Sequence, residues 1–182
     1  MTSTDLNIFA YETQGWTITG LAGTANSSLC GTNFPVLGGY NILANNAVFK
    51  KTYTSLPKHT AIYFQMTFAL IDTFKNPDYF TLTLSGTSIA GGTGLKNYNS
   101  YLTSSICGGS ASDSTQFTIM GTIPHNLNTI DFELIAKVAT GSGSGTIGIR
   151  NINFLLTNDT SITTAKTCYR LYDTQLLGLG GE

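Results

Sequence analysis

Charged residues are scarce in this sequence. Nine Lys and Arg and ten Asp and Glu make up 10% of 182 residues, whereas an ordinary soluble domain carries roughly 25%. Interspersed charge normally keeps a protein surface soluble, and here Thr, Ser, Asn and Gly take its place. This composition favours an assembling or glycan-covered extracellular protein. A neutral, hydroxyl-rich β-domain with no special partner is the alternative.

Other absences exclude further classes of partner and location. The net charge is -1 with a pI near 6.1, and Lys and Arg form no run, which argues against nucleic acid and anionic membranes as partners. No stretch approaches 18 apolar residues, so no membrane span is expected. Met1–Asn7 is too polar for a signal-peptide core, and an export signal would lie upstream of this numbering or have been removed. The 41% hydrophobic content and the chain length indicate one folded domain.

The sequence also lacks a recognisable catalytic motif. His59 and His125 are the two histidines, and neither lies in a metalloprotease spacing. Nothing resembles a nucleophile elbow, and Gly91–Gly94 lacks the lysine of a phosphate-binding loop. Asp72 and Asp78 could form a pair of carboxylates. An equally good structural interpretation places Asp72 at a strand end and Asp78 in a turn. We therefore expect no enzyme.

The pattern of apolar residues predicts an all-β fold. Apolar and polar residues alternate over Thr60–Asp72 and Tyr79–Ser85, with a turn at Lys75–Asp78 between them. Further strands are expected at Gly15–Thr19, Gly39–Leu43, Ala47–Tyr53, Gln116–Thr122, Ile130–Val138, Thr146–Leu156 and Thr167–Tyr172. The breakers between strands are Gly38-Gly39, Leu56-Pro57, Gly91–Gly94, Gly108-Gly109 and Gly141–Gly145. About eight or nine antiparallel strands at this spacing predict a single jelly-roll β-sandwich with little or no helix.

The three cysteines favour an exported chain. No CxxC or Cys/His cluster is present, so zinc is not expected. Joining Cys30 to Cys107 would close a loop of about 77 residues, worth roughly 4 kcal/mol on the chain-entropy model. That pairing leaves Cys168 free or bridged to another chain. Two N-glycosylation sequons begin at Asn26 and Asn158, in polar connecting segments.

Several short motifs carry a resemblance to a known family. In chain order they are Cys30-Gly31, Leu37-Gly38-Gly39-Tyr40, Leu56-Pro57-Lys58-His59, Ile71-Asp72-Thr73-Phe74, Ile106-Cys107-Gly108, Ile123-Pro124-His125 and Gly148-Ile149-Arg150-Asn151. This order resembles the N-terminal β-sandwich domain of ciliate cell-surface proteins that continue into furin-like, cysteine-rich repeats, a domain of the galactose-binding-like type. The resemblance covers about residues 15 to 157 and implies a cell-surface location more than an activity. Because no repeats follow Cys168, we expect the domain to stand alone.

The motif residues are interpreted mainly as structural. The Gly38-Gly39 pair before Tyr40 permits a positive φ or a close backbone approach. His59, Asp72, His125, Arg150 and Asn151 are likewise given structural roles, with Arg150 expected to satisfy backbone carbonyls or to pair with Asp72. The family's acidic residues are absent after Phe74 and at Asn151. Weak calcium candidates remain at Asp72, Asp78 and Asn151, so no cofactor is expected apart from a structural calcium ion.

The chain ends suggest assembly. We expect an N-terminal extension at 1–14, a sandwich at 15–157 and a C-terminal extension at 158–182. Asp5–Thr13 and Cys168–Leu179 are apolar and aromatic, and either segment can add an edge strand to its own sheet or to a neighbouring subunit. A contact of this kind that does not close produces a filament. The first hypothesis is therefore an extracellular structural protein, glycosylated and polymerising with copies of itself, with Cys168 as a candidate for an intermolecular disulfide.

A carbohydrate-binding, lectin-like surface module is the second hypothesis. Aromatic faces stack on sugar rings while Asn and Thr side chains supply hydrogen bonds. The loop at 97–101 (NYNSY) has this composition, with candidate sugar contacts at Asn97, Tyr98, Asn99 and Tyr101. The same loop also suits a polar subunit contact or an ordinary adaptable loop.

Overall fold

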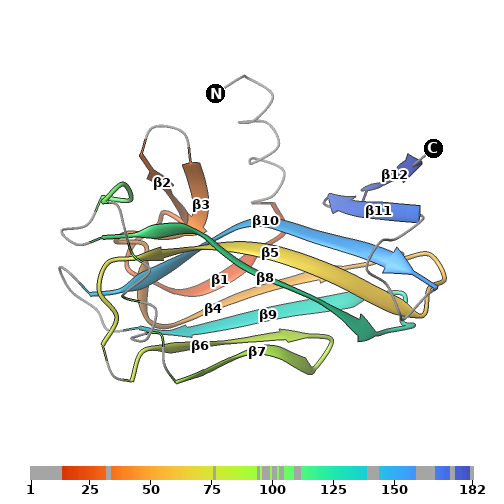
Figure 1. Cartoon of the computed structure of the whole chain (residues 1–182), viewed down its shortest axis with the longest axis horizontal. Helices are drawn as coiled ribbons and strands as arrows, with labels where there is room; N and C mark the ends of the chain where they lie inside the picture. Colours follow the sequence, from red (N-terminus) through yellow and green to blue (C-terminus); the bar gives the residue numbers. More distant parts are fainter. Residues whose placement is uncertain are drawn as a thin grey trace.

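Two antiparallel sheets of five strands each form the body of the molecule (Figure 1). The computed structural model describes residues 14–31, 34–75, 77–93, 95, 99, 102, 105–108, 112–138 and 144–158, and the backbone of 167–172 and 175–180. The ten sandwich strands are β1 (Thr17–Leu21), β2 (Ser27–Cys30), β3 (Phe34–Gly38), β4 (Leu43–Tyr53), β5 (Ala61–Ile71), β6 (Tyr79–Leu84), β7 (Thr87–Thr93), β8 (Ser114–Pro124), β9 (Ile130–Lys137) and β10 (Thr146–Thr157).

The strand order is that of a jelly roll. One sheet runs β1-β4-β9-β6-β7 and the other β2-β3-β10-β5-β8. Eight strands, β3-β10-β5-β8 facing β4-β9-β6-β7, make the two interlocked Greek keys of that fold, and β1 and β2 extend the edges. The expected all-β jelly-roll sandwich is therefore confirmed, with ten strands in place of eight or nine. No α-helix occurs in the part of the chain that the structure describes, and none of its segments is a helix able to cross a membrane.

The core lies between the two sheets. Burial alternates along β9 and along most of β5, as expected of strands with one face inward. Five of the largest fully buried side chains are aromatic: Phe49, Phe68, Phe74, Phe132 and Phe154. Phenylalanine side chains thus fill much of the space between the two sheets.

Two expectations about local structure were wrong. Gly39–Leu43 was expected to be a strand, but Tyr40–Ile42 form a turn and the strand precedes them as β3. Gly38, Gly39 and Asn41 have φ angles of 78°, 94° and 58°, which extended backbone does not allow. Gly91-Gly92 was read as a breaker, yet β7 continues through both residues to Thr93 and pairs with β6.

The C-terminal segment forms a hairpin of its own. β11 (Thr167–Tyr172) and β12 (Gln175–Gly180) pair with each other as a separate two-stranded antiparallel sheet. Neither strand extends a sheet of the sandwich, and the alternative of an edge strand added to a neighbouring subunit stays a prediction. The side chain of Cys168 lies outside the described part of the chain, as does the segment Asp5–Thr13.

Candidate functional site

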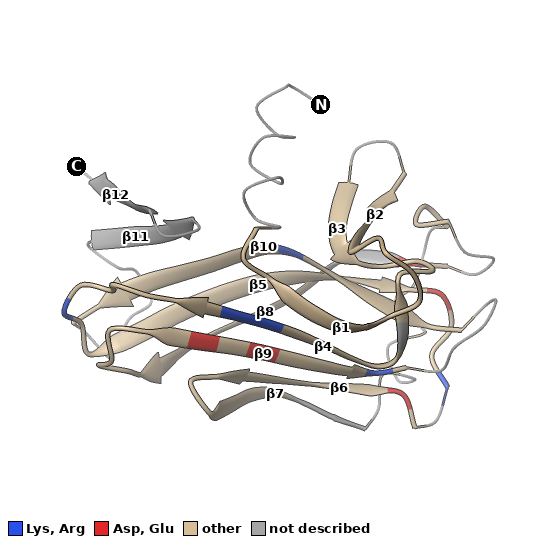
Figure 2. Cartoon of the chain, turned by 180° about the vertical axis from the view of Figure 1, so that it is seen from behind, with Lys and Arg blue, Asp and Glu red and all other residues tan. Residues whose placement is uncertain are grey.

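Charge is distributed unequally between the two sheets. The strands of the β1-β4-β9-β6-β7 sheet contain five charged residues, all on β4 and β9 (Figure 2). They are Lys50, Lys51, Asp131, Glu133 and Lys137. The strands of the β2-β3-β10-β5-β8 sheet contain a single charged residue, Arg150. The few charges in this chain therefore leave one face of the sandwich almost neutral.

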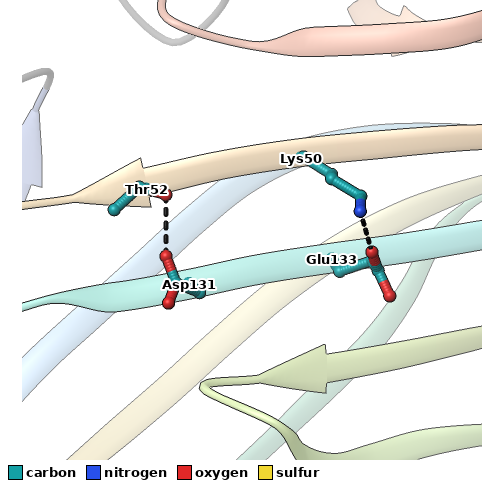
Figure 3. Close-up of polar contacts among 4 residues, drawn as sticks. All are labelled: Lys50, Thr52, Asp131 and Glu133. Carbon is teal, nitrogen blue, oxygen red and sulfur yellow. Dashed lines mark hydrogen bonds and ion pairs between the residues drawn. The ribbon is translucent and has the colours of Figure 1, made fainter.

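The charges on the first sheet meet partners on neighbouring strands. The Lys50 amine lies 2.6 Å from the Glu133 carboxylate, and the Thr52 hydroxyl donates to the Asp131 carboxylate at 2.7 Å (Figure 3). Lys137 lies over the ring of Tyr79, 5.3 Å from its centroid. Because the Lys50 side chain is 59% exposed, its ion pair is worth only about 0–1 kcal/mol.

The outward residues of the second sheet form three rows across β8, β5 and β10. Cross-strand register aligns Thr122 with Tyr63 and Leu155, Met120 with Gln65 and Asn153, and Thr118 with Thr67 and Arg150. We call the first eight of these residues the neutral face; Arg150 lies at its border. The neutral face presents one phenol ring, two amides, three hydroxyls and two apolar side chains, of which Met120 is 58% exposed.

β2 and β3 form a small lobe at the edge of the second sheet. They pair with each other and join β10 at Leu37 and Gly38, and a second apolar cluster that includes the Cys30–Cys107 disulfide packs them against β5. Its buried members are Cys30, Val36, Ala69, Ile71 and Cys107, with Phe34 and Tyr40 half-buried against them. Val36 sits directly over Gly148, where a Cβ atom would lie 2.6 Å from Val36 Cγ2. Figure 1 shows β2 and β3 projecting away from β10, and Phe34 of β3 contacts Arg150 at the border of the neutral face.

The expected disulfide pair, Cys30 with Cys107, is present. A buried carboxylate that sequence reasoning missed holds the loop around it. Asp113 accepts hydrogen bonds from the backbone N–H groups of Asp72, Ile106 and Cys107 at 3.0, 2.8 and 2.7 Å. A single Asp in a Ser-rich segment gave no signal in the sequence, because its three donors come from distant or irregular parts of the chain.

The two histidines form a buried chain of hydrogen bonds at one end of the sandwich. His59 Nδ1 lies 2.6 Å from the Pro57 carbonyl, His59 Nε2 lies 2.7 Å from His125 Nδ1, and His125 Nε2 lies 3.1 Å from Ser85 Oγ. A carbonyl only accepts, so Nδ1 of His59 donates to Pro57. With both rings neutral, His125 then donates to His59 and the Ser85 hydroxyl donates to His125.

This environment favours the neutral form of His125. Burial lowers the pKa of His125, and the adjacent His59 lowers it further, while a hydrogen bond with the backbone of Thr129 acts in the opposite direction. The pair links residues before β5 to the end of β8 and to the β6–β7 turn. The structural role expected for both histidines stays a prediction.

The remaining motif residues have structural surroundings. Gly38 and Gly39 have positive φ, and a Cβ on Gly39 would clash with Ser28 Oγ. Asn151 has a φ of 53° in a bulge of β10 between Arg150 and Asn153. The expected pair between Arg150 and Asp72 is absent from the ion pairs of the described residues; the Arg150 guanidinium lies over the Phe34 ring instead, 4.2 Å from its centroid.

The predicted sugar-binding loop is described only at Asn99. Its side-chain amide accepts from the backbone N–H of Phe74 and donates to the Phe74 carbonyl, both at 3.0 Å, which is a structural use of the group. Asn97, Tyr98 and Tyr101 lie outside the described residues.

The calcium candidates Asp72 and Asp78 have different local surroundings. Asp78 accepts from the backbone N–H of Lys75 at 2.6 Å, which closes the turn before β6. Asp72 is buried with a φ of 59° directly after β5. Within the described residues, no three His, Cys, Asp or Glu side chains gather into a group that could hold a metal ion.

Both sequon asparagines are exposed. Asn26 lies just before β2, and Asn158 directly follows β10. The hydroxyl of Ser28, the third residue of the first sequon, donates to the Gly38 carbonyl at 3.0 Å.

Comparison with known proteins finds solved structures of low sequence identity and low TM-score. No family model matches this chain, and no curated protein is similar to it. Among solved structures, the C-terminal family 6 carbohydrate-binding module of LamC, a marine laminarinase from Zobellia galactanivorans, is 12% identical, with 74% of this chain and 91% of that chain covered and a TM-score of 0.40. A family 35 carbohydrate-binding module from an environmental isolate is 14% identical, with coverage of 78% and 94% and a TM-score of 0.37.

A third similar structure is the PA14 sugar-binding domain from an RTX adhesin, 11% identical, with 97% of this chain and 83% of that chain covered and a TM-score of 0.34. The jelly-roll assignment itself rests on the strand order of this chain. The resemblance to ciliate surface proteins stays a prediction from the motifs.

Proposed function

We propose that this protein is a non-catalytic carbohydrate-binding domain and that the neutral face is its binding surface. The single observation that carries the proposal is the composition of that face: amide, hydroxyl and phenol groups in register on three adjacent strands, with one charge at the border. Sugars present hydroxyl groups and apolar ring faces, which neutral hydrogen-bonding groups and an aromatic ring complement. Such a surface needs no metal ion or catalytic base.

The side chains of the neutral face are held on a rigid scaffold. Its residues project from β5, β8 and β10, which pair along most of their length, and side chains on paired strands hold their spacing better than side chains on loops. Two contacts order the groups further: the Thr67 and Thr118 hydroxyls lie 3.4 Å apart, and Tyr63 donates weakly to Met120 Sδ at 3.7 Å. We infer that the Tyr63 ring and the Gln65 and Asn153 amides are the principal sugar contacts.

The proposed setting is outside the cell. A disulfide persists in oxidising compartments, and the Cys30–Cys107 bond joins the β2–β3 lobe to a distant loop. Exposed Asn26 and Asn158 are the proposed N-glycosylation sites. An intact mass above the peptide mass, lowered by Asn26→Gln and Asn158→Gln, supports glycosylation; an unglycosylated secreted chain argues against it.

The filament hypothesis stays a prediction. It depended on the two chain ends, of which Asp5–Thr13 lies outside the described residues, and the strands of the C-terminal segment pair with each other. Sedimentation of the purified chain at rising concentration tests it: a monomer throughout would argue against self-assembly.

Binding to a glycan array, followed by titration calorimetry on the best ligand, tests the carbohydrate-binding proposal. Tyr63→Ala is expected to weaken binding about 10-fold or more, since truncation of a tyrosine at the centre of a binding surface commonly costs more than about 1 kcal/mol. Tyr79→Ala is the matched control, because Tyr79 is a half-buried tyrosine on the outer face of the other sheet. Absence of binding to any glycan, or equal effects of the two substitutions, would overturn the proposal.

A further inference from the structure

Arg150 is the one charged residue on the strands of the sheet that carries the neutral face. We propose that Arg150 makes this face selective for glycans that carry a carboxylate, such as uronic or sialic acids. This inference rests on the proposed carbohydrate-binding function and adds to it the chemical class of the ligand.

The position of Arg150 is set by β10 and by the lobe. Arg150 pairs with Thr67 across β10 and β5, in the same row as Thr118, and it is half-buried. Its guanidinium carbon lies 4.2 Å from the centroid of the Phe34 ring on β3. The guanidinium therefore packs against the Phe34 ring of the lobe. The other two residues of its cross-strand row, Thr67 and Thr118, belong to the neutral face.

The hydrogen-bonding capacity of Arg150 is not used up by the protein. Its Nη1 atom is buried and has no hydrogen-bond partner among the described residues. A buried donor without a partner costs about 1–3 kcal/mol, so the guanidinium of this half-buried side chain is not saturated by the described protein groups.

Four of the five carboxylates in the described part of the chain are engaged elsewhere, and the fifth, Asp72, is buried and forms no ion pair with Arg150. Glu133 and Asp131 lie on the outer face of the other sheet, with Lys50 and Thr52. Asp113 accepts three backbone N–H groups, and Asp78 accepts one. No described carboxylate forms an ion pair with Arg150, which leaves a positive site at the edge of a neutral surface.

The shape of the group favours a carboxylate. A guanidinium is planar and always charged, and when an aromatic ring covers one face its in-plane N–H groups still match the two oxygens of a carboxylate. Along β5 the Thr67 row and the Gln65 row are separated by about 7 Å, two residues of extended strand. A sugar whose carboxylate meets Arg150 would thus place its ring hydroxyls toward Thr67 and the amides of Gln65 and Asn153.

The experiment compares matched sugars on the intact chain at fixed, near-physiological salt. Titration calorimetry uses oligogalacturonate, oligoglucuronate and oligomannuronate, their methyl esters and the corresponding neutral oligosaccharides. We expect at least one acid to bind about 10- to 100-fold more tightly than its ester and its neutral counterpart, the range for a charge-assisted pair. Arg150→Gln is expected to abolish this preference while leaving the affinity for neutral sugars within about 2-fold.

Lys137→Gln is the matched control, because it removes one positive charge from the opposite face, and it should leave the acid preference intact. Thermal unfolding checks that Arg150→Gln is folded, and the acid-to-ester comparison on the unchanged protein needs no variant. Esters that bind as well as acids, or a preference that survives Arg150→Gln, would overturn the inference and leave the proposed function standing. Absence of binding to every sugar would instead reject the proposed function.

Discussion

At the scale of single residues, the buried polar groups of this protein serve the backbone and each other. Asp113 is fully buried and binds three N–H groups, and His59 and His125 complete a chain from Pro57 to Ser85. The sequence marked the histidines as motif residues but did not indicate that they touch, because 66 residues separate them. Contact between such residues depends on which strands become neighbours.

Replacing Asp113 with Asn tests the first of these groups. Asp113→Asn replaces the carboxylate that accepts from three backbone N–H groups with a neutral amide, whose NH₂ group would face N–H donors. The free energy of unfolding should therefore fall by about 2–4 kcal/mol. Urea denaturation measures the change. Asp131→Asn, at an exposed carboxylate that accepts from Thr52, should cost less than about 1 kcal/mol. Similar losses at the two positions would contradict the assigned role.

The lowered pKa of His125 predicts a pH dependence of stability. Since the pKa in the folded protein lies below the unfolded value of 6.5, the unfolded chain binds more protons as pH falls through that value, and folding loses free energy. The contribution of neutral His125 to the free energy of unfolding is complete above about pH 6.5 and declines below that pH. Urea midpoints between pH 7.5 and pH 5 should fall for the wild type and change less for His125→Gln. Parallel profiles for the two proteins would show that another group is responsible.

At the scale of elements, positive φ angles decide where strands end. Ser85 and Gly86 have φ values of 46° and 80°, the pattern of a type I′ hairpin turn between β6 and β7. Gly38 and Gly39 end β3 in the same region of backbone space. Local sequence patterns mark such positions as breakers without specifying on which side of the glycines the strand lies, and this is why Gly39–Leu43 was misassigned.

Two glycine substitutions separate backbone strain from steric contact. Gly86→Ala meets nothing within 4 Å and has only its positive φ to accommodate, so it should cost about 1–2 kcal/mol. Gly39→Ala adds a clash with Ser28 Oγ and should cost more, about 3 kcal/mol or above. Chemical denaturation of both variants gives the comparison. Equal costs would mean that the lobe relaxes around Gly39 and is less tightly packed than the structure indicates.

At the scale of the whole molecule, two sheets of similar size present different surfaces. β4 and β9 collect the charges of one sheet, and the other sheet has only Arg150. The scarcity of charge in the sequence is therefore a property of one face more than of the surface in general. Such a face is suited to contact with a neutral or singly charged ligand.

The Cys30–Cys107 disulfide should stabilise the molecule as a whole. It closes a loop of 77 residues that spans β3 to β7, and its removal is expected to cost about 2–5 kcal/mol. The variant with both Cys30→Ser and Cys107→Ser tests this by urea denaturation, with the reduced wild type as a second measurement. A loss below about 1 kcal/mol in both would indicate that the second apolar cluster holds the lobe without the covalent bond.

The sequence alone determined the all-β class, most strand positions, the turn at Lys75–Asp78 and the partners Cys30 and Cys107. These are local or covalent properties, since alternation, glycine and proline act over a few residues and three cysteines leave few pairings. Only the tertiary structure decided that β10 lies between β3 and β5, that Arg150 borders a neutral face and that Asp113 anchors the disulfide loop. Strand partners are chosen by packing between residues far apart in the chain, and sequence periodicity carries no record of that choice.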